Sequence, residues 1–411
     1  MKKNYIAKGF LFISIFLTFS CTQDDFIETS VDIEKSHKVS IEEAKSNVLN
    51  FISKLDVQTR ANFNNVRINN VECVLSSDVL GTRATDAMLP DTMFYILNFE
   101  DSCGFAITST DDRSHQIYAL VENGNYSFNI NDTTDTGFDD FIAGMIIEEI
   151  DNRQQGLLNY ETEKDIIVDG PVIIPNKPAD KFEVMQPLLK TRWGQGYPYN
   201  IYCNGYPTGC MPTAISQICS FLEAPTHINY QTDTENGSGY INWVDIKNEC
   251  ENNCGYPLST EIKQQVGFAM RAWGCILGAR YTMNGTSVKA NESIDKLKTL
   301  FNVKGYKDYD QFSVFDIMYD LRSGEKIVLM IGEESNSEAG HAWVIDGYID
   351  EIKFGISTQY LHCNWGWSGE RNGYFISNAF RTLSNPIYDI DTYSSIFFNY
   401  NKKLRTATFT K

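Results

Sequence analysis

Long apolar runs and positive charge are both scarce in this sequence of 411 residues. Beyond the first twenty residues there is no run of 18 or more apolar residues, which excludes an ordinary transmembrane helix there. Lys and Arg number 35 against 53 Asp and Glu, which gives a net charge of −18. A protein that binds nucleic acid needs a basic face to displace counterions from phosphates, so this balance argues against nucleic acid as a partner.

Histidine is also rare, with five in the chain, and neither an internal repeat nor a low-complexity tract occurs. Hydrophobic residues make up 42% of the sequence and aromatic residues 13%, which is enough to build sizeable cores and too much for a disordered chain. At about 150 residues per domain, the length predicts two or three domains. These limits leave an acidic protein of more than one domain.

The first twenty residues resemble a signal for export. Three lysines precede an apolar run over residues 9–20, which is too short to span a bilayer comfortably. The run ends at Ser20-Cys21, and a small residue before a cysteine resembles a bacterial lipobox, in which the cysteine becomes the lipidated first residue. The acidic residues that follow are similar to the export signals of Bacteroidetes surface lipoproteins. We expect a signal peptide at 1–20 and a lipid on Cys21 that holds the exported protein at the outer membrane or cell surface; an ordinary secretory signal is the alternative.

Ten cysteines in an exported chain raise the question of disulfides. If Cys21 carries lipid, nine remain, so at least one is free or pairs with another molecule. Cys250 and Cys254 have no histidine beside them at zinc-ligand spacing. A disulfide or two buried thiols is therefore favoured over a metal site at these positions.

The spacing of hydrophobic residues divides the chain into two parts. Two stretches of the first part have helical spacing and three short runs between them are typical of strands; in chain order these are 40–55, 93–98, 104–109, 116–121 and 138–155. Three prolines and a glycine at 169–180 then indicate a linker. We therefore predict a small α+β domain at 21–181, with the linker at about 169–181, and a second domain at 182–411.

The second domain is predicted to be α+β as well, because its helices precede its strands. The predicted helices are 210–223, 259–273, 293–300 and 314–321, and the predicted strands are 326–331, 341–348, 360–365 and 373–376. The residues that could carry chemistry lie at the start of the first of these helices and on two of the strands.

Cys210 is placed at the N-terminus of a predicted helix, directly after Gly209. The partial positive charge at a helix N-terminus stabilises a thiolate, which is the form of cysteine that attacks a carbonyl carbon. A lone cysteine in this position is more often a small buried residue, so the assignment needs further residues.

His341 opens a strand-like run, and the small residues around it leave space for its imidazole. An imidazole can pair with a thiolate as the imidazolium and later protonate a leaving amine. A histidine that is merely hydrogen-bonded at a strand end is the alternative.

Three further residues complete a candidate site. Alternate side chains of a strand face opposite ways, so Asn364 shares a face with His362, and Trp365 lies on the other face. An asparagine carbonyl can fix the tautomer of the histidine, and a nearby indole can shield that contact from water, although core packing also explains Trp365. The amide of Gln195, fifteen residues before Cys210, can donate to an oxyanion together with the Cys210 N–H.

Four motifs, in this order, resemble those of the streptopain family of secreted cysteine peptidases. They are Trp-Gly-Gln at 193–195, Gly-Cys-Met-Pro-Thr-Ala at 209–214, Gly-His-Ala-Trp-Val-Ile-Asp-Gly-Tyr at 340–348 and Asn-Trp-Gly-Trp at 364–367. The first domain is similar too, because Gly-Phe-Ala-Ile-Thr-Ser at 104–109 and the helix around 41–55 resemble the inhibitory propeptide of that family. The resemblance implies a papain-like two-lobed peptidase domain preceded by a propeptide.

The resemblance also implies a role for each residue of the candidate site. Cys210 would be the nucleophile, His341 its acid/base partner and Gln195 the oxyanion donor. Asn364 would orient the histidine, and Trp365 would cover that contact. We therefore expect a cysteine endopeptidase made as a self-inhibited zymogen, which cuts proteins or peptides and needs neither a metal nor an organic cofactor.

The propeptide would be the intramolecular inhibitor of this enzyme, either by blocking the cleft or by displacing the histidine. Cleavage roughly between residues 175 and 186 would activate the protease and free it from its lipid anchor. Two other functions stay open. The same Cys-His site could serve an amidase or acyl transferase on cell-wall peptides, or the chain could be a non-catalytic surface lipoprotein.

Overall fold

The computed structural model describes residues 37–58, 66–80, 92–129, 136–154, 180–283, 285–301, 304–307, 313–333, 340–353, 355–380 and 402–411. The predicted export signal, Cys21 and residues 169–179 of the predicted linker lie outside these ranges, so the statements about them stay predictions. We call the described part of 37–154 the N-terminal region and the described part of 180–411 the C-terminal region. Both belong to one compact unit, His37–Lys411.

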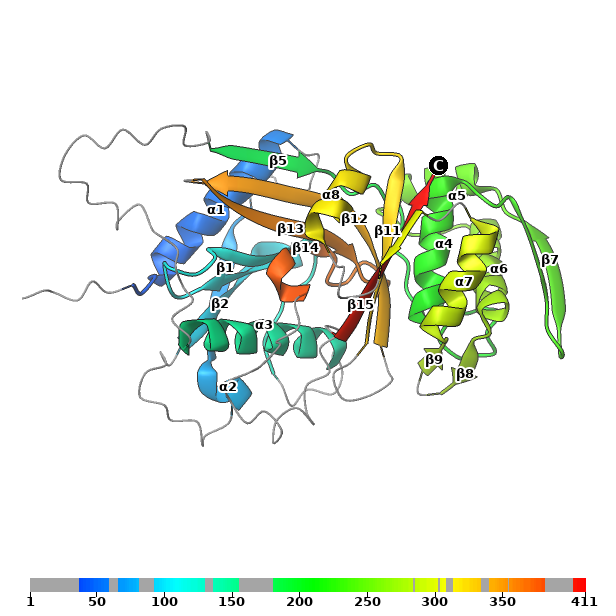
Figure 1. Ribbon diagram of the computed structural model, residues 1–411, viewed down its shortest axis with the longest axis horizontal. Helices are drawn as coiled ribbons and strands as arrows, with labels where there is room; N and C mark the ends of the chain where they lie inside the picture. Colours follow the sequence, from blue (N-terminus) through cyan, green and yellow to red (C-terminus); the bar gives the residue numbers. More distant parts are fainter. Residues whose placement is uncertain are drawn as a thin grey trace, which may run out of the picture. The chain divides into compact units, whose positions relative to one another are not determined.

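The N-terminal region consists of helices packed on an antiparallel meander of strands (Figure 1). Its elements are α1 (Ile41–Gln58), β1 (Ile68–Leu75), α2 (Ser76–Leu80), β2 (Thr92–Phe99), β3 (Phe105–Ser109), β4 (Ile117–Val121) and α3 (Thr136–Gln154). Ser40 caps α1, because its hydroxyl accepts the Glu43 N–H at 3.2 Å. The predicted helices and strands are confirmed, whereas β1 was missed because only Val74 of this edge strand is buried and its hydrophobic alternation is weak.

The C-terminal region contains every helix and strand predicted for it and several shorter elements besides. Its helices are α4 (Cys210–Leu222), α5 (Trp243–Asn252), α6 (Thr260–Leu277), α7 (Ala290–Leu300) and α8 (Val314–Leu321). Its strands are β5 (Lys181–Met185), β6 (His227–Gln231), β7 (Asn236–Tyr240), β8 (Arg280–Thr282), β9 (Gly285–Ser287), β10 (Lys304–Lys307), β11 (Lys326–Glu333), β12 (Gly340–Lys353), β13 (Ile356–Asn364), β14 (Gly373–Ile376) and β15 (Lys402–Thr410), and a short 3-10 turn, η3 (Ser377–Phe380), follows β14. The predicted α+β class is confirmed.

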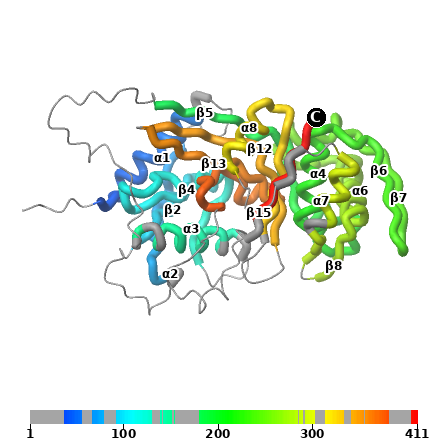
Figure 2. The backbone as a smooth tube through the Cα atoms, in the orientation of Figure 1, coloured from blue at the N-terminus to red at the C-terminus, as the bar shows by residue number. Residues whose placement is uncertain are grey.

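One sheet runs through both regions. Its strands lie in the order β1-β2-β3-β4-β14-β13-β12-β11-β15-β10, and β5 pairs with β12. The regions meet where β4 pairs antiparallel with β14, with Val121 opposite Gly373 and Ala119 opposite Phe375. The last described strand, β15, lies between β11 and β10. Figure 2 shows it in red. The predicted boundary at 169–181 therefore separates two sequence segments whose strands join in one sheet.

The two hydrophobic cores lie on opposite faces of the C-terminal strands. Successive residues of β11 and β12 alternate between the cores, as the two-residue period of a strand requires. Val328, Met330, Trp343 and Ile345 face the core that the N-terminal region shares, whereas Ile327, Leu329, Ala342 and Val344 face the core under α4, α5 and α6. The strands that carry the candidate site are thus buried on both faces.

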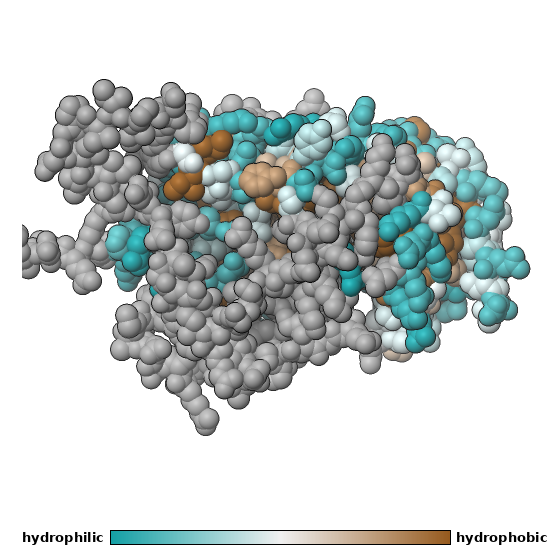
Figure 3. Space-filling view, viewed as in Figure 1, coloured by the Kyte–Doolittle hydropathy of each residue, from teal (hydrophilic) through white to brown (hydrophobic). Residues whose placement is uncertain are grey.

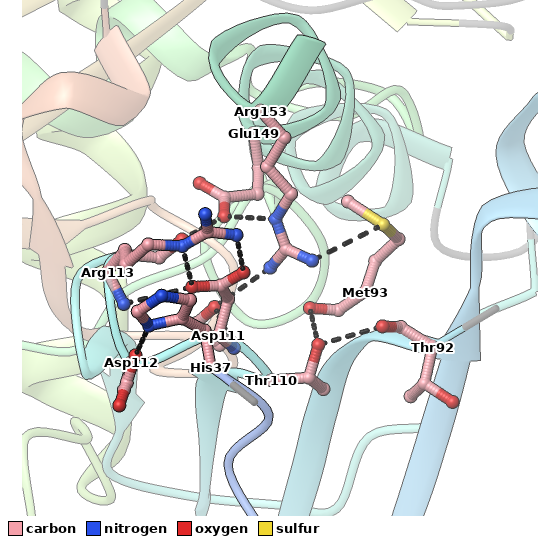
Figure 4. A network of polar contacts seen from close by, with 11 residues as sticks. His37, Thr92, Met93, Thr110, Asp111, Asp112, Arg113, Glu149 and Arg153 are labelled. Atoms are coloured by element: carbon pink, nitrogen blue, oxygen red, sulfur yellow. Dashed lines mark hydrogen bonds and ion pairs between the residues drawn. The ribbon is translucent and has the colours of Figure 1, made fainter. Parts of the chain in front are cut away.

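A buried ion pair within α3 is hydrogen-bonded to the meander of the N-terminal region (Figure 4). Arg153 Nε lies 2.7 Å from Glu149 Oε1, and the two side chains are 5% and 2% exposed. A further nitrogen of Arg153 donates to the Ser109 hydroxyl at 3.0 Å, at the end of β3. Beside them, Asp111 binds the Arg113 guanidinium at 2.8 Å. The helix that reaches the candidate site is therefore anchored by hydrogen bonding as well as by packing.

The described part of the surface in Figure 3 is mostly polar. Hydrophilic residues predominate over the described part of the face in Figure 3, with small hydrophobic patches between them. Among the described residues, no helix has the length and apolar character needed to cross a membrane.

Candidate active site

Cys210 is the first residue of α4, as the sequence predicts. The chain enters the helix through Gly209, whose φ of 94° is a conformation that residues with a side chain rarely adopt. A Cβ at this glycine would lie 3.0 Å from the Thr286 methyl group of β9. Thr213 closes the first turn by donating its hydroxyl to the Gly209 carbonyl at 2.8 Å. A glycine is thus needed directly before the cysteine for both conformation and space.

The thiol of Cys210 lies between α4 and β12. Its side chain is partly buried, and it is hydrogen-bonded to the backbone of Ala342 and Met211. Burial raises the pKa of the thiol above its usual value, and these backbone N–H groups act in the opposite direction. At neutral pH the thiol is therefore protonated in this state of the chain.

His341 directly precedes Ala342, the residue of β12 whose backbone contacts the thiol. Its Nε2 lies 2.8 Å from the backbone carbonyl of Trp365. Because a carbonyl can only accept, Nε2 carries the proton and Nδ1 is the basic nitrogen of the neutral ring. Burial lowers the pKa of His341 to about 4, with the carbonyl acting in the opposite direction. The ring is therefore neutral at pH 7.

Three indole rings stack along His341. The distances between ring centroids are 4.9 Å to Trp367, 5.9 Å to Trp343 and 6.1 Å to Trp365. Trp365 also contacts Phe141 of α3, with centroids 5.2 Å apart. The N-terminal region thus reaches the candidate base through a single intervening ring.

Asn364 is buried beside the site, but its amide binds other groups than the predicted one. Its Oδ1 accepts from Gln217 Nε2 at 3.1 Å, and its Nδ2 donates to the Thr191 carbonyl at 3.0 Å. The acceptor on His341 Nε2 is the carbonyl of the next residue, Trp365. The orientation that the sequence assigned to the Asn364 amide is therefore supplied here by backbone.

Gln195 lies in a loop that is bonded to the segment leading into Cys210. Its backbone carbonyl accepts the Thr208 N–H at 2.9 Å, two residues before the cysteine. The preceding Gly194 packs on Ser368, where a Cβ would come within 2.1 Å of the hydroxyl. The loop therefore brings Gln195 close to the start of α4, and its role as oxyanion donor stays a prediction.

A second buried histidine site lies one strand away and was not predicted. His362 Nδ1 lies 2.6 Å from Asp346 Oδ1, and its Nε2 lies 3.3 Å from Glu122 Oε1. Arg192 approaches the other oxygen of Glu122 at 3.2 Å. Burial favours the neutral imidazole, but the charges of Asp346 and Glu122 outweigh it and raise the pKa of His362 to about 9. Burial also disfavours the Glu122 carboxylate, yet His362 and Arg192 hold its pKa below the usual range.

Sequence reasoning missed Gln217 and this charged group for the same reason. Each member lies in a different element, so only the tertiary structure brings them together. One signal was available: Gln217 interrupts the apolar face of α4 and is fully buried, and a buried amide requires polar partners. The nine described cysteines all carry free thiols, Cys203 and Cys210 among them.

The C-terminal region matches a family of known peptidases. Residues 193–375 match the model of the Peptidase C10 family, and the resemblance to the streptopain family is thereby confirmed. The thiol protease/hemagglutinin PrtT of Porphyromonas gingivalis is 24% identical over 337 residues, which cover 72% of this chain and 34% of that protein. The chain thus spans about a third of the length of that relative.

A solved structure shares the fold across both regions. A fragment of prointerpain A from Prevotella intermedia superposes with a TM-score of 0.50 at 20% identity, covering 78% of this chain and 96% of the fragment. Active interpain A from the same organism is also 20% identical, with a TM-score of 0.41 over 55% of this chain and 94% of its own. The likeness to prointerpain A confirms the predicted fold class.

Proposed function

We propose that the protein is a cysteine peptidase, on the premise that residues 193–375 match the model of the Peptidase C10 family. The observation that carries the proposal is the start of α4 beside β12, where the Cys210 thiol meets the backbone of Ala342, next to His341. A thiol and an imidazole are the two groups with which a cysteine peptidase hydrolyses a peptide bond.

The reaction uses Nδ1 of His341 as the base, because Nε2 is bonded to the Trp365 carbonyl. Cys210 gives its proton to Nδ1, and the thiolate attacks the carbonyl carbon of the peptide. The negative charge that develops on the carbonyl oxygen is stabilised by the Cys210 N–H and the Gln195 amide. The imidazolium then protonates the departing amine as the C–N bond breaks. Water, activated by the neutral imidazole, hydrolyses the thioester and restores the thiol.

The full-length chain is proposed to be a latent zymogen, with the N-terminal region as its inhibitor. Two observations support this. The thiol of Cys210 and the ring of His341 are both neutral at pH 7, whereas attack requires the thiolate and imidazolium. In addition, Phe141 of the N-terminal region packs on Trp365, which stacks on His341. Removal of Phe141 loosens the stacking of Trp365 on His341, and the imidazole can then be protonated to the imidazolium.

The proposed location follows from the sequence alone. Lipid on Cys21 would anchor the zymogen at the outer membrane or cell surface, and a cut in the linker would detach the C-terminal region from that lipid. Labelling of the expressed chain with radioactive palmitate, compared with Cys21→Ala, tests the anchor. We expect label on the wild-type chain only, and equal labelling of both would contradict a lipid on Cys21.

The peptidase proposal is tested by self-processing. Residues 22–411 are expressed without lipid, as the wild-type sequence and as Cys210→Ala, and each is incubated with a reducing agent. The masses and N-termini of the products are followed over time. We expect the wild-type chain to cut itself near the linker and then to digest casein, while Cys210→Ala stays intact.

If neither chain changes, the linker is cut with an added protease and the casein assay is repeated. Activity at that point means that a second enzyme performs activation. A folded, cut and reduced protein without activity on casein or any other protein would refute the peptidase. It would instead favour the amidase or acyl transferase on cell-wall peptides, or the non-catalytic lipoprotein.

A further inference from the structure

We propose that the C-terminal region contains a carboxylate-binding site, which Glu122 of the N-terminal region fills in the full-length chain. The site is formed by His362 on β13 and by Arg192, in the loop that follows β5. Glu122 Oε1 lies 3.3 Å from His362 Nε2, and its Oε2 lies 3.2 Å from an Arg192 guanidinium nitrogen. Each oxygen thus has its own cation, which suits a planar carboxylate and not a single-atom ion.

Three contacts that position His362 and Arg192 lie within the C-terminal region. Asp346 holds His362 Nδ1 at 2.6 Å, and its second oxygen accepts the Leu189 N–H at 3.0 Å. Arg192 is fixed through its backbone N–H, which donates to the Gly255 carbonyl at 2.9 Å. All of these groups belong to the C-terminal region. The site is therefore organised in advance for an anion that comes from elsewhere.

The charge balance favours an anion at this position. With Glu122 in place and His362 protonated, two cations and two carboxylates face one another and the group is neutral. Without Glu122, either a net positive charge is left in a place where the imidazole is 4% exposed, or His362 must give up its proton. An uncompensated buried charge is strongly destabilising, so the site favours any carboxylate that can reach it.

The direction of approach defines the class of ligand. Glu122 directly follows β4, and its N–H donates to the Asn372 carbonyl at 3.0 Å, just before β14. The carboxylate therefore arrives on an extended strand that pairs with β14. The ligand class is an acidic side chain on an extended peptide, either the N-terminal region itself or, if that region is released, another peptide. Only this last step rests on the proposed function.

The site can be tested in the full chain with acetate as the probe. Glu122→Ala removes a CH2COO− group, which is acetate, and the side chains of Glu122 and Arg192 are 15% and 33% exposed, so a small solute can enter. The variant is made in a Cys210→Ala background, which prevents self-cleavage. We expect Glu122→Ala to lower the melting temperature by about 5 °C. Sodium acetate should restore much of this loss in a saturable manner, and sodium chloride at equal ionic strength should not.

Glu351→Ala is the matched control, because Glu351 also joins the two regions, through Lys54 at 2.6 Å, but at a lysine that is 45% exposed. Its melting temperature should not respond to acetate. Adding Arg192→Ala to Glu122→Ala should abolish the acetate effect. Equal responses to acetate and chloride, or an acetate effect that survives the loss of Arg192, would overturn the proposal.

If Glu122→Ala does not fold in either salt, Glu122→Gln decides, because it keeps the shape and removes the charge. It should melt well below Glu351→Gln, and an equal melting temperature for the two would overturn the site. Because the chain used here lacks the Cys210 thiol and the readout is melting, this test is independent of whether the protein is a peptidase.

Discussion

The surroundings of His341 and of His362 differ in one respect, and it decides the charge of each ring. Both imidazoles are buried, but His341 is enclosed by indole rings and one carbonyl, whereas His362 lies between two carboxylates. Burial alone favours the neutral ring, and it prevails at His341, whose pKa falls to about 4. At His362 the carboxylates prevail and the pKa rises to about 9. Depth is therefore a poor guide to the charge of a histidine, and the nearest charged groups are a better one.

The N-terminal region contacts both sites by different means. At His341 it acts through packing, from Phe141 to Trp365. At His362 it acts through charge, with the carboxylate of Glu122. The packing contact at His341 is expected to affect catalysis, and the charged contact at His362 is expected to affect how the N-terminal region is held. The following predictions test this division of roles.

The largest effect is expected from replacing each histidine in protein whose linker has been cut. His341→Ala should lower kcat/KM on a peptide substrate by about 10⁴-fold or more, since the general base is lost. His362→Gln should keep kcat close to the wild-type value, because this ring touches Asp346 and Glu122 and not the thiol. Initial rates on a fluorogenic peptide measure both. Similar losses in the two variants would contradict the division.

Phe141→Ala should have the next largest effect, through the cavity that it leaves beside Trp365. We expect a loss of about 4 kcal/mol in the free energy of unfolding, measured with urea. Phe138→Ala is the matched control on the same helix, because Phe138 packs on Phe105, Tyr126 and Phe375.

The control should cost similar stability, but only Phe141→Ala should raise the pKa of His341 from about 4 towards its usual range, as followed by NMR titration. An unchanged His341 titration in Phe141→Ala would show that the packing contact does not hold the ring neutral.

The smallest effect is expected in the dependence of stability on pH, and it has opposite sign at the two rings. The folded pKa of His362, about 9, lies above its unfolded value of 6.5. Protonated His362 therefore contributes about 3 kcal/mol to the free energy of unfolding. This contribution is complete below pH 6.5 and is lost as the pH rises through 9. The folded pKa of His341, about 4, lies below 6.5, so its contribution is present above pH 6.5 and is lost as the pH falls towards 4.

Urea unfolding from pH 4 to pH 9.5, in a Cys210→Ala background, measures both limbs. His362→Gln should flatten the alkaline limb alone, and His341→Asn the acidic limb alone. A His362→Gln variant that keeps the full alkaline loss would mean that another group titrates there.

The sequence predicts the candidate site where local signals place its residues. Cys210 follows a glycine and begins an apolar helix, and His341 begins an apolar strand, so their elements could be recognised one at a time. The partner of Asn364 could not be recognised in this way. That partner is Gln217 on α4, 147 residues earlier in the chain. The pattern of a strand shows which face a residue occupies, but it does not show which residue of another element packs against that face.

The organisation of the sheet shows the same limit. The strands β4 and β14 were each predicted from short strand-like runs, but their pairing joins segments that are far apart along the chain. Glu122 looks like an ordinary acidic residue after a strand until this pairing brings it to His362, 240 residues away. Long-range pairing is set by the total fit of two surfaces, which no local window contains.

The pairing of β4 with β14 also bears on how the protein behaves once it is cut. If the N-terminal region departs, β14 becomes a sheet edge with unpaired backbone groups, and such an edge is a template on which other chains can assemble into aggregates. β14 spans only Gly373–Ile376, and the backbone turns into η3 at Ser377. So short an edge gives an incoming strand little length to add to, which should help the released enzyme stay monomeric at high concentration.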